Sequence, residues 1–205
     1  DQEVMTRLIG SFNAYNLVAI YGVAELLGME KSEILRHLSL VTNVSGRFQH
    51  YTTTFEITVI IDYAHTPDAL KNVLETINTI RTKKQTLITV VGCGGDRDKT
   101  KRPKMGHIAS ALSSKVFFTS DNPRSEKPQQ IISEMEAGVK PENLDKIISI
   151  KDRKEAITAA CKLARPHDII LIAGKGHEAY QEVRGVRHKF NDNKLSQTIL
   201  IGLEL

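Results

Sequence analysis

The sequence is poor in cysteine and has no long apolar run. Its 205 residues include two cysteines, Cys93 and Cys161, which are far apart and outside any CxxC or metal-ligand spacing. Such usage is typical of a reduced setting, so we expect a cytoplasmic protein. No apolar stretch approaches the ~18 residues that a membrane span requires, and no secretory signal is found, which argues against a membrane protein.

Several kinds of functional site are also missing. The phosphate-loop pattern GxxxxGK[ST] occurs nowhere, so any ATP chemistry needs residues outside this sequence. The histidines show no metal-ligand spacing, and we predict no metal site and no catalytic residue. The net charge is +4 without a Lys/Arg block interleaved with aromatics. The charge either serves solubility through many lysines or indicates a small anionic partner, and it argues against nucleic acid.

From about residue 46, strand patterns alternate with helix patterns. The expected strands are Phe48–Thr53, Ile57–Ile61, Thr86–Val91, Lys115–Thr119, Lys146–Ile150 and Ile169–Ala173, with a hairpin at 179–189 around Gly185. The expected helices are Pro67–Arg81, 103–113, Pro128–Ala137, Asp152–Ala164 and 192–202. This alternation predicts an α/β fold with a Rossmann-like, mainly parallel sheet flanked by helices.

Residues 1–44 form a different, mostly helical segment. Asn13 and Asn16 are expected at the start of a helix that Gly28 ends, and Ser32 is expected to cap a shorter helix to about His37. Two helices cannot build a core alone, and Asp1 opens in mid-pattern without an initiator Met. We therefore expect a helical remnant of another domain over 1–44, a second domain over 45–205, and a longer parent protein.

Polar turns follow three of the expected strands, namely Gly92–Lys99, Asp121–Arg124 and Gly174–Glu178. In a parallel sheet these turns meet at one edge, where ligands of open α/β folds bind. The guanidiniums of Arg97 and Arg124 suit carboxylates, and a carboxylate such as Glu178 suits an ammonium. The set predicts a pocket for a zwitterion, although a single turn of this kind is more often purely structural.

A fourth strand end, Ile60–Pro67, carries groups that suit a nucleotide. Asp62 could accept hydrogen bonds from ribose hydroxyls, with Tyr63 and His65 bordering a base. Alternatively, Asp62 only caps the helix that starts near Pro67. Arg47 could reach a phosphate or be a solvated charge at a strand edge.

Together these segments resemble the Mur ligases, ATP-dependent enzymes that add amino acids to the peptidoglycan precursor. The segments that carry the resemblance are Asn13–Asn16, Ser45–Arg47, Asp62–Pro67, Gly92–Lys99, Lys101–Pro103, Asp121–Arg124 and Gly174–Glu178. The pattern is most similar to the ligases that add the third residue of the stem peptide. The resemblance implies that 1–44 ends a central ATPase domain and that 45–205 is the C-terminal, amino-acid-binding domain.

The resemblance also implies residue roles. The nucleotide-binding residues would be Asn16, Arg47, Asp62 and His65. The amino-acid-binding residues would be Arg97, Asp121, Asn122, Arg124, Gly174 and Glu178. The Asp-Asn-Pro-Arg form goes with meso-diaminopimelate, whose second carboxylate Arg124 would bind. Lysine lacks that carboxylate and would leave Arg124 unpaired, at a cost of roughly 1–3 kcal/mol.

The implied reaction uses ATP and Mg²⁺ to convert the D-glutamate carboxylate of a UDP-muramoyl dipeptide into an acyl phosphate. The amine of meso-diaminopimelate then displaces phosphate. The magnesium ligands and the phosphate loop are not in this sequence, so we predict that the chain alone neither hydrolyses ATP nor ligates. Alternatives are a lysine-adding ligase, a folylpolyglutamate- or cyanophycin-type ligase, and a non-catalytic amino-acid-binding module.

Overall fold

The computed structural model describes residues 5–6, 8–42 and 44–204, apart from the side chains of Ser11 and Glu204. The chain divides into two compact units, Asp1–Val44 and Ser45–Leu205. Among the described residues, no helix is both long enough and apolar enough to cross a lipid bilayer.

The first unit contains two helices, α1 (Ser11–Leu26) and α2 (Lys31–Leu40), joined by a turn at Gly28. Gly28 has a φ of 82°, a left-handed conformation that costs glycine little. The buried apolar side chains between the helices are Leu17, Ile34 and Leu38. The assignment of this unit to a central ATPase domain stays a prediction.

The two helices of this unit differ in detail from those predicted. Helix α1 begins at Ser11, so Asn13 and Asn16 lie inside its first turns, where Asn13 Nδ2 donates to Ile9 O at 2.7 Å. Ser32 is not the cap of α2, which begins at Lys31 after Glu30 and runs on to Leu40 instead of ending near His37. The reason is burial, because Ile34 and Leu38 repeat at helical spacing and pack against α1.

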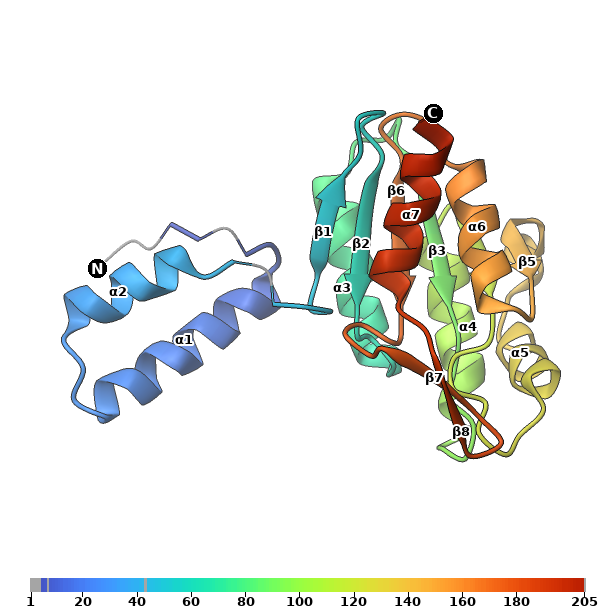
Figure 1. Ribbon diagram of the computed structural model, residues 1–205, viewed down its shortest axis with the longest axis horizontal. Coiled ribbons are helices and arrows are strands. Elements are labelled where there is room, and N and C mark those ends of the chain that lie inside the picture. Colours follow the sequence, from blue (N-terminus) through green and yellow to red (C-terminus); the bar gives the residue numbers. More distant parts are fainter. Residues whose placement is uncertain (1–4, 7, 43, 205) are drawn as a thin grey trace. The chain divides into compact units, whose positions relative to one another are not determined.

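The second unit is built on a six-stranded sheet with the order β1-β2-β6-β3-β4-β5 (Figure 1). The strands are β1 (Gln49–Thr52), β2 (Thr58–Asp62), β3 (Leu87–Val91), β4 (Lys115–Phe118), β5 (Ile147–Ser149) and β6 (Ile169–Ala173). Only β1 is antiparallel to its neighbour, and β2 to β6 are parallel. The prediction of a Rossmann-like, mainly parallel α/β sheet is confirmed.

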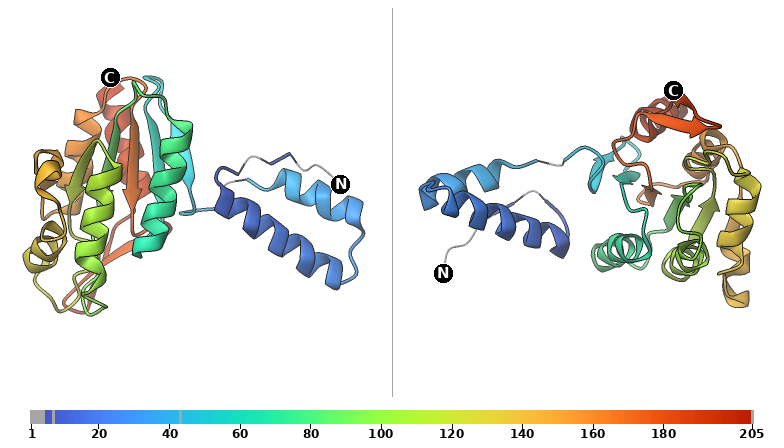
Figure 2. Two further views of the ribbon diagram at one scale, coloured as in Figure 1. Left: turned by 180° about the vertical axis from the view of Figure 1, so that it is seen from behind. Right: turned by 90° about the horizontal axis from the view of Figure 1, so that it is seen from below.

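Helices cover both faces of this sheet (Figure 2). They are α3 (Pro67–Ile80), α4 (Lys101–Leu112), α5 (Pro128–Glu136), α6 (Arg153–Leu163) and α7 (Asp192–Glu204). Helices α3, α4 and α5 lie on one face, and α6 and α7 on the other. Strands β2, β3 and β6 are apolar along most of their length because both of their faces are covered.

The helix boundaries differ slightly from those predicted. Helix α4 begins at Lys101 instead of 103, because Pro103 is tolerated in a first turn, where its missing N–H has no partner to lose. A 3₁₀ turn over Pro141–Lys146 was not predicted. The hairpin around Gly185 is present as β7 (Tyr180–Val183) and β8 (Val186–Lys189).

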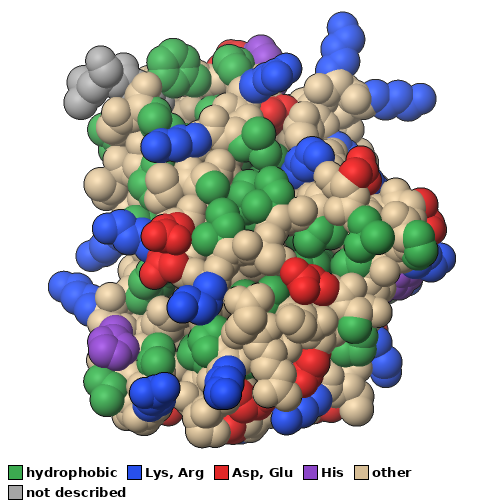
Figure 3. Space-filling model, turned by 90° about the vertical axis from the view of Figure 1, so that its right-hand side faces the viewer, with side chains coloured by type: hydrophobic (Ala, Val, Ile, Leu, Met, Phe, Trp, Pro, Cys, Tyr) green, Lys and Arg blue, Asp and Glu red, His purple; other side chains and the backbone are tan. Residues whose placement is uncertain are grey.

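Charged side chains of both signs are spread over the face drawn in Figure 3, where Lys and Arg lie among Asp and Glu. On that face the positive charges do not gather into one basic patch.

Candidate functional site

The turns at the carboxyl ends of β2, β3, β4 and β6 meet at one edge of the sheet, as their parallel order requires. Gly95 N–H donates to Asn122 O at 2.8 Å, which joins the turns that follow β3 and β4. Gly174 N–H donates to Asp62 O at 3.0 Å, which joins those that follow β6 and β2. A Cβ at Gly174 would lie 2.7 Å from Asp121 Oδ2, so the β6 and β4 turns are also in contact.

A hydrogen-bonded cluster lies at the centre of this edge. Lys175 Nζ donates to Asn122 Oδ1 at 2.8 Å and to Glu178 Oε2 at 3.1 Å. Asn122 Nδ2 donates to the same Glu178 oxygen at 2.8 Å. Asp121 is buried, with Oδ1 3.8 Å from Lys175 Nζ. Three of the predicted amino-acid-binding residues are therefore brought together, around a lysine that was not predicted.

Arg124 is held in place by backbone and side-chain contacts. Its φ is 49°, and its N–H donates to the carbonyl of Glu182 on β7 at 3.1 Å. Nη1 donates to Gly95 O at 2.8 Å, and Nε lies 3.5 Å from Glu182 Oε2. Nη2 has no hydrogen-bond partner among the described residues, so one edge of the guanidinium is open to a ligand.

Arg97 differs from Arg124 in being exposed. Within the described part of the chain, its side chain makes no hydrogen bond or ion pair. Its turn is nevertheless fixed, because the carboxylate of the preceding Asp96 accepts from Ser125 Oγ at 2.5 Å and from Ser125 N–H at 3.2 Å. Arg97 is therefore an exposed cation on a fixed turn, close in sequence to the contacts that hold Arg124.

Asp62 is buried at the end of β2 and binds backbone groups on both oxygens. Oδ2 accepts from Phe48 N–H at 2.7 Å, and Oδ1 accepts from Ala64 N–H at 2.8 Å. Burial raises the pKa of Asp62, while these two hydrogen bonds and the nearby Arg47 oppose the rise. The alternative that Asp62 caps α3 is wrong, because Thr66 is the N-cap and its Oγ1 accepts from Ala69 N–H.

Ring side chains gather beside Asp62. The guanidinium of Arg47 lies 5.0 Å from the centre of the Tyr63 ring. The rings of His65 and His177 lie 4.6 and 5.4 Å from the same ring. His65 and Arg47 are exposed. An exposed cation with three planar rings suits a nucleotide, although binding by Arg47, Asp62 and His65 stays a prediction.

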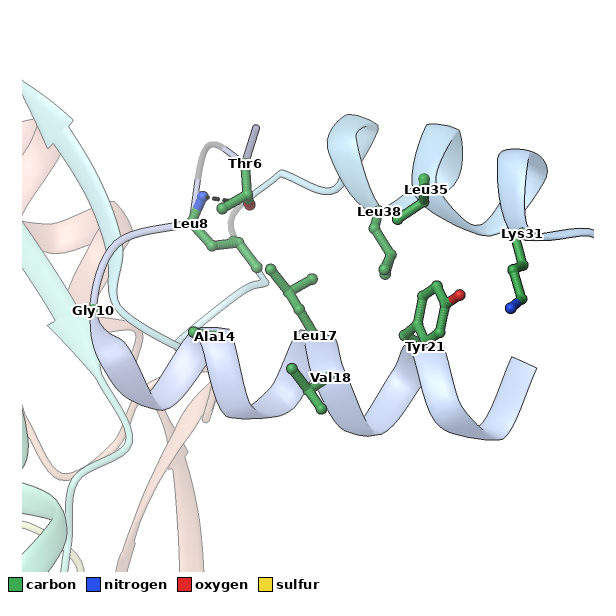
Figure 4. Close-up of a pocket in the computed structure, with 10 residues that line it drawn as sticks. All are labelled: Thr6, Leu8, Gly10, Ala14, Leu17, Val18, Tyr21, Lys31, Leu35 and Leu38. Carbon is green, nitrogen blue, oxygen red and sulfur yellow. Dashed lines mark hydrogen bonds between the residues drawn. The ribbon is translucent and has the colours of Figure 1, made fainter. Parts of the chain in front are cut away.

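Asn16 lies in the other unit, on α1. Its side chain is exposed, and Nδ2 donates to Asn13 Oδ1 at 3.4 Å. The same helix lines a cavity of about 690 Å³ between α1 and α2 (Figure 4). Leu17, Tyr21 and Leu38 point into this space, which is mainly apolar. It has none of the features of the predicted amino-acid or nucleotide sites.

Potential metal ligands do not cluster in the described part of the chain. Across residues 5–6, 8–42 and 44–204, no three His, Cys, Asp or Glu side chains lie together as metal ligands would. The use of Mg²⁺ by the longer enzyme stays a prediction, and none of the described residues is assigned to hold it.

Comparisons with known proteins agree with this geometry. A family model described as "Mur ligase, glutamate ligase domain" matches residues 46–176. The chain is 55% identical over 194 residues to the UDP-N-acetylmuramoyl-L-alanyl-D-glutamate--2,6-diaminopimelate ligase of Cytophaga hutchinsonii. That match covers 95% of this chain and 40% of the relative. The chain belongs to the Mur ligase family, and it spans about two fifths of the length of this relative.

Solved structures show the same fold. A structure of a UDP-N-acetylmuramoyl-L-alanyl-D-glutamate--2,6-diaminopimelate ligase matches with a TM-score of 0.75 and 39% identity, over 98% of this chain and 41% of that one. The folylpolyglutamate synthase of Mycobacterium tuberculosis matches with a TM-score of 0.66 at 20% identity, over 84% of this chain and 39% of that one. At 20% identity, the match to the folylpolyglutamate synthase shows a shared fold and nothing about function.

Three groups at the site were missed by sequence reasoning. They are the buried Lys175, the Arg102–Glu126 pair and the Arg153–Asp192 pair. Lys175 and Arg102 lie inside segments that carry the family resemblance, so their position was a signal. No feature of the sequence indicates that these side chains are buried, because a Lys or Arg in a sequence is ordinarily expected to be exposed.

Proposed function

We propose that this chain is the acceptor-binding part of an ATP-dependent ligase that joins meso-diaminopimelate to UDP-N-acetylmuramoyl-L-alanyl-D-glutamate. The observation that carries the proposal is the arrangement at the carboxyl edge of the sheet. Arg124 presents Nη2, Arg97 is exposed nearby, and Glu178 presents one oxygen that has no partner among the described residues. Two cations and one carboxylate complement a ligand that bears two carboxylates and an ammonium.

In this proposal the residues of the chain act by binding and orientation. Glu178 holds one ammonium of meso-diaminopimelate, and Arg97 and Arg124 hold its carboxylates. The other amine is left free to attack the acyl phosphate of the dipeptide, forming a C–N bond as phosphate leaves with the bonding electrons and the amine loses its proton. Holding the attacking amine in line with the acyl phosphate would accelerate the reaction by proximity and orientation.

ATP supplies the phosphoryl group of that acyl phosphate. The chain's own candidates for contact with ATP are Arg47, Asp62 and His65, with Asn16 in the first unit. Since the sequence lacks a phosphate loop, we expect no ATP hydrolysis by this chain alone. Release of inorganic phosphate from ATP by the purified chain would contradict that expectation.

The test of the proposal is an amide NMR titration of the chain with meso-diaminopimelate, L-lysine and L-glutamate in parallel. We expect shifts around Arg97, Arg124 and Glu178 with meso-diaminopimelate only. An equal response to L-lysine would favour a lysine-adding ligase, and a response to L-glutamate alone would favour a folylpolyglutamate-type enzyme. No response to any of the three would remove preformed amino-acid binding from the proposal.

A further inference from the structure

Lys175 is a fully buried lysine at the centre of the acceptor cluster. Its side chain has no exposed surface, and Nζ lies 5.7 Å from the centre of the Tyr180 ring. A buried ammonium is costly unless it is paired and hydrogen-bonded. The turn that carries Lys175 has an unusual backbone, since the flanking Gly174 and Gly176 have positive φ values of 113° and 53°.

The turn leaves little freedom for a different backbone path. A Cβ at Gly176 would lie 2.8 Å from Gly46 O and 2.8 Å from the Cβ of Tyr63. A Cβ at Gly174 would lie 2.7 Å from Asp121 Oδ2. The two glycines therefore let the segment pack tightly while the lysine between them points inward.

The hydrogen bonds of Lys175 determine how Asn122 is oriented. Asn122 Oδ1 accepts from Lys175 Nζ at 2.8 Å and from Glu182 N–H at 2.9 Å. With its oxygen bound on that side, the amide must direct Nδ2 toward Glu178, where it donates at 2.8 Å. The orientation of this amide therefore follows from the lysine together with the Glu182 N–H.

Glu178 is oriented by the same lysine. Oε2 accepts from both Lys175 Nζ and Asn122 Nδ2. Oε1 has no partner among the described residues, and 17% of the side chain is exposed. One oxygen of Glu178 is therefore committed to the protein, and the other is presented outward.

The ammonium of Lys175 faces two carboxylates, those of Asp121 and Glu178. The fully buried guanidinium of Arg153, which binds Asp192 through hydrogen bonds of 2.9 and 2.8 Å, also interacts electrostatically with both of them. A ligand ammonium at Glu178 Oε1 would meet an oxygen that has no partner among the described residues.

We infer that Lys175 is the positioning residue of the acceptor pocket: it fixes the Asn122 amide and directs Glu178 Oε1 toward the ammonium of the incoming amino acid. This inference rests on the proposed function. Lys175 touches no ligand itself, because it has no exposed surface. It acts on recognition through Asn122 and Glu178.

The direction in which one substitution changes ligand affinity distinguishes a positioning role of Lys175 from a pure charge effect. Lys175→Met keeps an unbranched side chain of similar length and removes the ammonium. If Lys175 acted by charge alone, its loss would make the pocket more negative and would tighten the binding of an ammonium. If it acts by positioning, its loss frees Asn122 and Glu178 and weakens binding.

The experiment measures affinity for meso-diaminopimelate and for pimelate, the same dicarboxylate without amino groups, by NMR titration of the 205-residue chain. We expect Lys175→Met to bind meso-diaminopimelate about tenfold or more weakly and to lose much of its preference over pimelate. The matched control is Lys154→Met, an exposed lysine on α6, which should bind as the unaltered chain does. Unchanged or tighter binding by Lys175→Met would overturn the inference.

A second readout needs no ligand. In the free chain, the ammonium of Lys175 should give a ¹H–¹⁵N resonance protected from exchange with water, and this resonance should shift in Asn122→Ala. The absence of a protected ammonium would overturn the inference even if Lys175→Met failed to fold. If the unaltered chain binds no meso-diaminopimelate although the ammonium is protected, preformed amino-acid binding is removed from the proposed function, and the ligand role of Lys175 falls with it.

Discussion

Arg102 and Glu126 form two parallel hydrogen bonds, with Nη1 2.9 Å from Oε2 and Nη2 2.8 Å from Oε1. Arg102 has no exposed surface, and Nη1 also donates to Glu134 Oε2 at 2.6 Å. Glu126 accepts in addition from Asp96 N–H at 2.6 Å. The pair thus ties the turn that carries Arg97 to the turn that carries Arg124.

We expect Arg102→Met to destabilise the second unit by about 3 kcal/mol or more, because Glu126 and Glu134 both lose the buried guanidinium that binds them. The measurement is urea unfolding, followed by the backbone amide resonances of β3. The control is Lys99→Met, whose exposed ammonium lies 3.4 Å from the Glu126 carboxylate and should contribute within about 1 kcal/mol. Similar effects of the two changes would contradict the role given to the pair.

The same pair makes stability depend on acid pH. The hydrogen bonds from Arg102, joined by the one from Asp96 N–H, lower the pKa of Glu126 from 4.5 to about 2. A lowered pKa means that the stabilisation is fully present above pH 4.5 and is lost as the pH falls toward 2. The stability difference between the unaltered chain and Glu126→Gln should therefore be largest at neutral pH and shrink across this window. A difference that stays constant from pH 7 to pH 2.5 would refute this.

Gly95 and Pro123 allow a test of how closely the β3 and β4 turns pack. A Cβ at Gly95 would lie 2.0 Å from Pro123 O, so Gly95→Ala must push the two turns apart. We expect a loss of about 1–3 kcal/mol in unfolding free energy and weaker binding of meso-diaminopimelate. The control is Gly202→Ala on α7, where a Cβ would meet nothing within 4 Å, and stability should stay equal or rise by up to about 1 kcal/mol.

Much of the second unit could be predicted because its pattern is local. Pro67 and the apolar series Leu70, Val73, Leu74 and Ile77 indicated helix α3, and all four apolar side chains are buried. The β-branched stretch that became β2 likewise indicated a buried strand. Since parallel strands end at one edge, their polar turns also indicated where the charged groups would meet.

The contacts that shape the site could not be predicted, because they join residues far apart in the sequence. Arg124 pairs with Val183 on β7 and is bound to Glu182, and neither contact leaves a pattern near Arg124. A sequence pattern also assigns lysine and arginine to the surface, so the full burial of Lys175 and Arg102 had no signal. Charges that are buried in networks become visible only when the partners from several turns are placed together.

Arg124 provides the sharpest test of substrate choice. Arg124→Met removes the guanidinium that would bind the second carboxylate of meso-diaminopimelate, a group that L-lysine lacks. We expect the chain's affinity for meso-diaminopimelate to fall by about tenfold or more, equivalent to about 1.4 kcal/mol, while any weak response to L-lysine stays the same. Calorimetry or the NMR titration measures the affinity of the chain for each of the two ligands.

Arg184→Met is a closely matched control for that substitution. Arg184 has the same φ of 49° as Arg124, so both changes place methionine in the same left-handed backbone conformation. Its side chain is exposed, and its N–H donates to Arg124 O at 2.7 Å whichever side chain is present. Binding should therefore survive Arg184→Met. Equal losses in the two variants would show that strain in the β7–β8 hairpin, and not the Arg124 guanidinium, governs affinity, and the assignment of meso-diaminopimelate through Arg124 would have to be abandoned.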